Sequence, residues 1–103
     1  MAITLVRDVD VLLDTLVEAA RRRPDPFQYR WALGMPEHQV SHPGIEPDRR
    51  IGVHPGALSR LGDLHYVHPA VRTGPTAPDR ADFSITEQAY AEYDRRHPAA
   101  PVA

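Results

Sequence analysis

The sequence contains no cysteine, no lysine and no long run of apolar residues. Without cysteine the chain has no disulfide, no thiol nucleophile and no thiolate ligand for zinc. No stretch approaches the roughly eighteen consecutive apolar residues of a membrane-spanning helix, and the start lacks the charged and apolar segments of a secretion signal. These absences predict a soluble protein of the cytoplasm.

Motifs for catalysis and for nucleotide binding are also missing. The serines Ser41, Ser59 and Ser84 lie in no nucleophile-elbow context. The glycines form neither a phosphate-cradling loop nor a dinucleotide fingerprint. We therefore expect a binding protein and not an enzyme, with no catalytic residue, no cofactor and no small-molecule substrate.

The charge is nearly balanced, at 12 basic and 14 acidic residues and a formal net charge of −2. Such a chain lacks the strong positive field that draws proteins to DNA or to anionic membranes. All of the basic residues are arginine. That choice is explained either by a GC-rich genome or by a use for planar, bidentate contacts with carboxylate or phosphate.

A length of 103 residues fits one domain, in which the 11 prolines are unevenly placed. They cluster between residues 36 and 78, where long regular elements are disfavoured. We expect residues 35–53 to be mostly loop, with at most one helical turn.

Two helices are predicted in the first two thirds of the chain. Apolar residues recur at steps of three and four from Val9 to Arg23, with Asp8 as the N-cap and Pro24 as the stop. A second, shorter helix begins at Pro55 and runs to Leu61, with Gly62 as its left-handed cap.

Residues 25–34 admit two interpretations. Asp25-Pro26 at one end and Gly34 at the other are typical helix boundaries, and we favour a short helix. The alternation of Phe27, Tyr29 and Trp31 with polar residues instead indicates a strand. These three aromatic residues either belong to the core or form an exposed docking surface for a protein partner.

The C-terminal third predicts a β-hairpin followed by a helix. Strands at 64–71 and 81–85 are joined around Gly74, and Thr86 caps a last helix that packs back on the hairpin. Pro98 and Pro101 end the regular structure, so a frayed tail is expected at 97–103.

The runs Ala57-Leu58-Ser59-Arg60-Leu61-Gly62-Asp63-Leu64 and Phe83-Ser84-Ile85-Thr86-Glu87-Gln88-Ala89 resemble the final third of winged helix-turn-helix domains. The resemblance covers about residues 55–96, with the helix at 9–23 as the first helix of the family. It implies an α+β, winged-helix-like single domain over residues 1–96. An unrelated small α+β domain fits the same pattern.

The resemblance implies a small DNA-associated regulator of transcription. The contacts would come from the recognition helix and the wing, through Ser59, Arg60, Arg72 and Arg80. Against this, residues 48–96 carry as many acidic residues as arginines. The alternative is a protein-interaction adaptor or dimerising accessory subunit that uses Phe27, Tyr29 and Trp31 or the final helix.

Histidines at a four-residue spacing, His38 and His42, raise the possibility of a zinc site. Pro36 and Pro43 confine any helix there to about one turn, so the two rings would not share a helix face. We expect polar loop residues and no metal.

Overall fold

The computed structural model of the protein describes residues 6–30, 38–46, 48–69, 71 and 80–98, and of Arg80 only the backbone. In this part of the chain, three helices and five strands follow one another in the order α1, β1, β2, β3, α2, β4, β5, α3. The strands form an antiparallel sheet in the order β3-β2-β1-β5-β4. The predicted α+β class is therefore confirmed.

Helix α1 (Val9–Arg22) forms as the apolar spacing predicts. The Asp8 carboxylate caps it by accepting hydrogen bonds from the backbone N–H groups of Asp10 and Val11, at 2.8 and 3.1 Å. Arg23 is already extended, as expected for a residue that precedes a proline. The apolar stripe is fully buried: Leu12, Leu13, Leu16, Val17 and Ala19.

The favoured short helix at 25–34 is wrong where the structure describes it, because residues 27–30 form strand β1 (Phe27–Arg30). This strand is the middle of the sheet and pairs with β2 on one side and β5 on the other. Phe27 and Tyr29 alternate into the core, each 1% exposed. Strand pairing on both edges and burial of two large rings outweigh the helix-boundary signals of Asp25-Pro26 and Gly34. Local propensity is a weak preference that tertiary contacts override.

The predicted loop at 35–53 is also wrong in large part, because it contains strands β2 (His38–Ser41) and β3 (Arg50–Val53). The turn between them holds Pro43 and Gly44 and is closed by a 2.9 Å hydrogen bond from the His42 N–H to the Arg49 carbonyl. The proline thus marks a turn between two short strands. Val6 adds a parallel bridge to the outer edge of β3.

Helix α2 (Pro55–Asp63) confirms the second predicted helix, which is capped by the His54 side chain. It continues past Leu61, and Gly62 lies inside it. The left-handed residue is His65, with φ 62°, so the predicted glycine cap is wrong. The chain crosses through α2 from one edge strand, β3, to the other, β4 (Val67–His68).

The predicted C-terminal hairpin is present but short. Val67 pairs with Ile85 and His68 with Ser84, and β5 (Arg80–Ile85) makes its longer pairing with β1. Thr86 caps α3 (Glu87–Arg96) as predicted, since its hydroxyl accepts a hydrogen bond from the Ala89 N–H at 3.3 Å.

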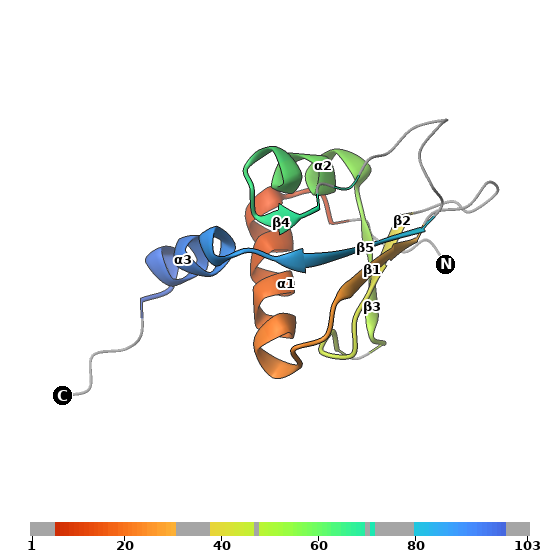
Figure 1. Ribbon diagram of the computed structural model, residues 1–103, viewed down its shortest axis with the longest axis horizontal. Helices are drawn as coiled ribbons and strands as arrows, with labels where there is room; N and C mark the ends of the chain where they lie inside the picture. Colours follow the sequence, from red (N-terminus) through yellow and green to blue (C-terminus); the bar gives the residue numbers. More distant parts are fainter. Residues whose placement is uncertain (1–5, 31–37, 47, 70, 72–79, 99–103) are drawn as a thin grey trace.

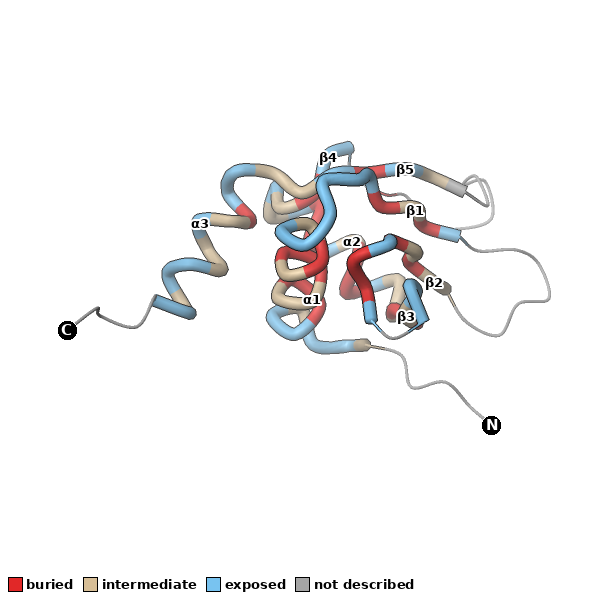
Figure 2. The backbone as a smooth tube through the Cα atoms, turned by 90° about the horizontal axis from the view of Figure 1, so that it is seen from below, coloured by how far each residue is buried: buried red, intermediate tan, exposed pale blue. Residues whose placement is uncertain are grey.

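The sheet has a buried face and an exposed one. In both views the strands lie on one side of α1 and α3 lies on the other, while α2 packs beside α1 (Figures 1 and 2). The buried face carries Phe27, Tyr29, Val40, Val53 and Phe83 against α1. We call the opposite side the open face; the strand registers assign to it Gln28, Arg30, Gln39, Ser41, Arg50, Gly52, His68, Arg80, Asp82 and Ser84.

Candidate nucleic-acid interface

Of the four predicted DNA contacts, Ser59, Arg60 and the backbone position of Arg80 lie within the described residues. Ser59 and Arg60 lie on α2, which packs beside α1 on the helical side of the sheet. Arg80 is the first residue of β5, where its register position belongs to the open face. Arg72 lies outside the described residues. A helix and a wing that meet one DNA groove together are therefore not assembled from Arg60 and Arg80.

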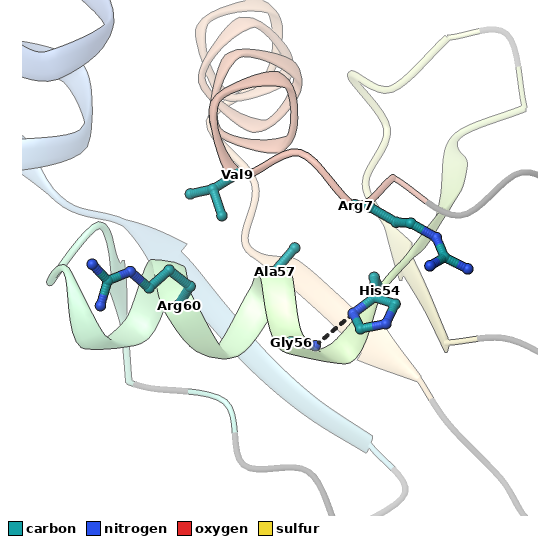
Figure 3. A pocket seen from close by; sticks show the side chains of 6 residues that line it. All are labelled: Arg7, Val9, His54, Gly56, Ala57 and Arg60. Atoms are coloured by element: carbon teal, nitrogen blue, oxygen red, sulfur yellow. Dashed lines mark hydrogen bonds between the residues drawn. The ribbon is translucent and has the colours of Figure 1, made fainter.

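A hollow of about 410 Å³ lies at the start of α2, lined by Arg7, Val9, His54, Gly56, Ala57 and Arg60. In Figure 3, Val9 and Ala57 form its apolar floor, while Arg7 and Arg60 stand at opposite ends and point away from each other. The Gly56 N–H donates to His54 Nδ1 at 3.1 Å, so the capping nitrogen is already occupied. The two arginines do not converge on a common ligand position.

The surface of α2 is also poor in positive charge. Its buried residues are Ala57, Leu58, Leu61 and Gly62, which leaves Gly56, Arg60 and Asp63 exposed. The Asp63 carboxylate offsets the Arg60 guanidinium within one turn. A helix that reads a DNA groove presents several base-contacting side chains with basic phosphate contacts nearby, and α2 does not.

Two residues of the predicted aromatic docking surface, Phe27 and Tyr29, are buried in the core. Phe27 stacks between the His42 and Phe83 rings, at centroid distances of 4.1 and 5.3 Å. Tyr29 is equally buried, and its hydroxyl is hydrogen-bonded to His38 Nδ1. Burial lowers the pKa of His38, and the charge of the nearby His54 lowers it further. Trp31 lies outside the described residues.

The open face concentrates arginine. Arg30 and Arg50 are exposed and form no ion pair within the described chain, and Arg80 shares their face by register. Asp82 is the one acidic residue among the positions that the registers assign to this face. The remaining positions are serine, glutamine, histidine and glycine. The local balance is thus positive in a protein whose net charge is negative.

Acidic residues are instead gathered where α3 meets α1. Arg21 forms a bidentate pair with Asp94, at 2.8 and 2.9 Å, and Arg96 forms one with Asp14, at 3.3 and 2.5 Å. The Tyr93 hydroxyl donates to Glu18 at 2.8 Å, and His97 Nε2 lies 2.9 Å from Asp14. We call these contacts the α1–α3 clamp. His97, the predicted start of the frayed tail, is therefore held against α1.

The clamp changes the acidity of its carboxyl groups. Burial alone would raise the pKa of Asp14, but hydrogen bonds from Arg96 and His97 outweigh burial and hold that pKa below its usual value. The hydrogen bond from Arg21 likewise lowers the pKa of Asp94. The arginines of α3 are thus paired with carboxylates, whereas Arg30 and Arg50 form no ion pair within the described residues.

His42 has a structural role. Its ring is 2% exposed; Nδ1 accepts a hydrogen bond from the Gly44 N–H at 2.9 Å, and Nε2 lies 2.8 Å from the Asp25 carbonyl. Because Nδ1 accepts, the proton sits on Nε2 and is donated to Asp25. The polar loop residue expected from the sequence is in fact a buried link between the turn and the segment before β1. Among the described residues, no three potential ligands come together to hold a metal ion.

Sequence reasoning did not single out Arg30 and Arg50. A signal for Arg30 was present, because a strand that buries Phe27 and Tyr29 must turn Gln28 and Arg30 to its other side. The helical interpretation of residues 25–34 makes no use of this signal. Arg50 had no such signal, since β3 was expected to be loop.

Comparisons with protein families, with characterised proteins and with solved structures find no match for this chain. The winged-helix resemblance therefore has no support beyond the residues that carry it. None of the described helices has the length and apolar character needed to cross a membrane.

Proposed function

We propose that the protein is a small nucleic-acid-binding module that contacts the phosphate backbone of DNA through the open face of its sheet. The observation that carries the proposal is the separation of charge. Arg30, Arg50 and the position of Arg80 share the open face with one acid, Asp82, while the clamp gathers carboxylates on the far side of α1. Phosphate is the ligand that planar, always-charged guanidinium groups suit best.

The composition of the open face favours contact with the phosphate backbone of DNA over contact with the edges of its bases. The rings of Phe27, Tyr29 and Phe83 all belong to the buried face, so none of them offers a stacking platform for bases. Contacts with phosphate carry no sequence information, whereas base edges are read by side chains that enter a groove. Binding of this kind is independent of sequence and sensitive to salt.

The adaptor alternative has less to support it. Phe27 and Tyr29 lie in the core. Among the described residues, Val11, at 52% exposure, is the one exposed large apolar side chain. Protein-protein interfaces bury an apolar centre, often with aromatic anchors, inside a polar rim. The open face offers polar and positive groups for a polyanion.

The test is fluorescence anisotropy with a labelled random-sequence duplex, titrated at low salt and then at rising salt. We expect saturable binding whose log affinity falls with log salt at a slope of about −3 if all three arginines engage phosphates. Arg50→Gln should weaken binding roughly fivefold or more and reduce the slope by about one.

Arg60→Gln is the matched control, because Arg60 is an exposed arginine on the helical side. It should leave both affinity and slope unchanged. If Arg60→Gln weakens binding and Arg50→Gln does not, contact is made through α2. If the wild type shows no salt-sensitive binding at micromolar protein, the proposed function is wrong.

A further inference from the structure

Helix α3 is attached to the rest of the molecule by different kinds of contact at its two ends. At its start, the Thr86 hydroxyl donates a 2.6 Å hydrogen bond to the His65 carbonyl, and the Thr86 N–H donates to the Tyr66 carbonyl at 3.1 Å. At its end, the α1–α3 clamp joins charged and polar side chains of the two helices. The start is therefore fixed by the hydrogen bonds of Thr86, and the end is held by charge.

Apolar packing beneath α3 is sparse. Ala89 is the one residue of this helix that is buried. A hollow of about 250 Å³ lies where the helix joins the core, between Ala20 of α1, Phe27 of β1, Ile85 of β5 and Tyr90 of α3. Detaching α3 would expose little apolar surface, so the hydrophobic effect resists that movement only weakly.

The attraction of α1 for α3 comes from a row of acids. Asp10, Asp14 and Glu18 follow one another at four-residue steps on α1. Carboxylates at this spacing share one helix face and repel each other. Arg96 of α3 faces the row, and Asp10 as well as Asp14 stabilises its positive charge. Docking of α3 therefore relieves the repulsion along α1.

The clamp also offers Arg96 a second partner. Arg96 donates to Asp14 at 2.5 Å and to Glu92, one turn back on its own helix, at 3.2 Å. Arg95 donates to the same Glu92 at 2.7 and 2.8 Å. If the contact with Asp14 opens, Arg96 keeps a carboxylate within α3. An ion pair that can be exchanged in this way costs less to open than one that leaves its cation without a partner.

We propose that α3 is a detachable arm, which leaves α1 as a unit while α1, α2 and the sheet stay folded. The clamp is the latch that sets how often the arm is released, and Thr86 is the pivot. Release uncovers Ala89 and the rings of Tyr90 and Tyr93, and it opens the hollow at the joint. The arm lies on the far side of α1 from the open face (Figure 2), so this inference does not depend on the proposed function.

The experiment is native-state hydrogen exchange of the full chain, followed by ¹H–¹⁵N NMR at pH 7 and low salt. It compares the protection factors of amides 91–96 in α3 with those of amides 27–30 in β1. We expect the α3 amides to be roughly tenfold or more less protected, because release of the arm does not require unfolding of the domain.

Low concentrations of urea separate release of the arm from global unfolding. Protection of β1 should fall steeply with urea, because global unfolding exposes much surface. Protection of α3 should fall with a slope of roughly half that of β1 or less, because release exposes little. Equal protection and equal slopes in α3 and β1 would show that the helix unfolds only with the whole domain, and would overturn the proposal.

Asp14→Asn tests the latch, since it removes the central charge without changing the sequence of α3. We expect it to lower the protection of the α3 amides roughly fivefold. Asp63→Asn, the same substitution at an exposed position of α2, is the matched control and should leave their protection unchanged. Unchanged α3 protection in Asp14→Asn would show that the clamp does not hold the arm, and the inference would be wrong.

Discussion

Gly44 shows how closely a single residue fits in this molecule. A Cβ atom built on Gly44 would lie 2.3 Å from the Ala19 carbonyl oxygen in α1. The Gly44 carbonyl also accepts a 3.0 Å hydrogen bond from Arg22, and its N–H donates to His42. The turn between β2 and β3 therefore rests directly on the backbone of α1, which only a residue without a side chain allows.

At this residue we expect Gly44→Ala to destabilise the fold by about 1–3 kcal/mol, the usual cost of overpacking. Urea unfolding followed by circular dichroism measures the change. Gly56→Ala is the matched control, since its Cβ would meet the movable His54 ring at 3.1 Å and the substitution favours a helix. It should change stability by less than about 1 kcal/mol. Equal losses in both variants would contradict the close approach to Ala19.

Two arginines of the candidate site, Arg30 and Arg50, were not predicted from the sequence. The winged-helix resemblance points to Ser59 and Arg60, because they are polar residues of the would-be recognition helix. The face on which an arginine lies in a strand depends on register, and a shift of one residue reverses it. Arg30 is assigned to the open face once residues 27–30 are known to form a strand that buries Phe27 and Tyr29.

Among the elements, α3 is held in an unusual way. Ala89 is its one buried residue, and Tyr90 and Tyr93 are only partly buried. Much of its attachment to α1 comes from the clamp, in which Asp14 receives both Arg96 and His97. Contacts between charged groups depend on pH, whereas apolar packing does not.

The clamp predicts a loss of stability in acid. The pKa of Asp14 and that of Asp94 are both lower in the folded chain than the usual value for aspartate. Groups with a lowered folded pKa add stability that is complete above the unfolded pKa and is lost as pH falls through the folded one. The Tm should therefore hold above about pH 5 and fall below about pH 4.

Asp14→Asn tests this directly by thermal unfolding between pH 7 and pH 3. At pH 7 we expect the variant to be about 1 kcal/mol less stable than the wild type, and its decline in acid to be shallower. Glu46→Gln, at an exposed turn position, should follow the wild-type profile. Identical profiles for Asp14→Asn and the wild type would show that the clamp contributes nothing.

The elements differ in how well the sequence predicts them, for a physical reason. Local signals indicate all three helices. Asp8 caps α1, Pro55 begins α2 and Thr86 caps α3, and apolar residues recur at helical spacing. Strands β2 and β3 have only four residues each and lie close to turn-forming prolines and glycines. Their stability comes from pairing across the sheet, which no local window contains.

The whole molecule divides its charge between two sides. One side presents the arginines of the open face, while the other gathers the carboxylates of α1 and α3 around Arg21 and Arg96. A net charge of −2 hides this division, because the two sides cancel in the sum. Approach to a polyanion is governed by the local field of the surface that meets it, and only weakly by the total.

The division of charge between the two sides predicts one orientation of the protein on DNA. The sheet turns toward the phosphates, and α3 points away from them on the far side of α1 (Figure 2). The winged-helix comparison predicts the opposite, with α2 against the DNA. The two orientations place different backbone amides at the interface.

The most direct measurement is a ¹H–¹⁵N NMR titration of the labelled protein with a short random-sequence duplex at low salt. We predict saturable shift changes at the amides of β1, β2, β3 and β5, reversed by added salt, and no comparable changes in α2. Changes centred on residues 55–63, or none that saturate, would contradict the assignment of the open face as the nucleic-acid surface.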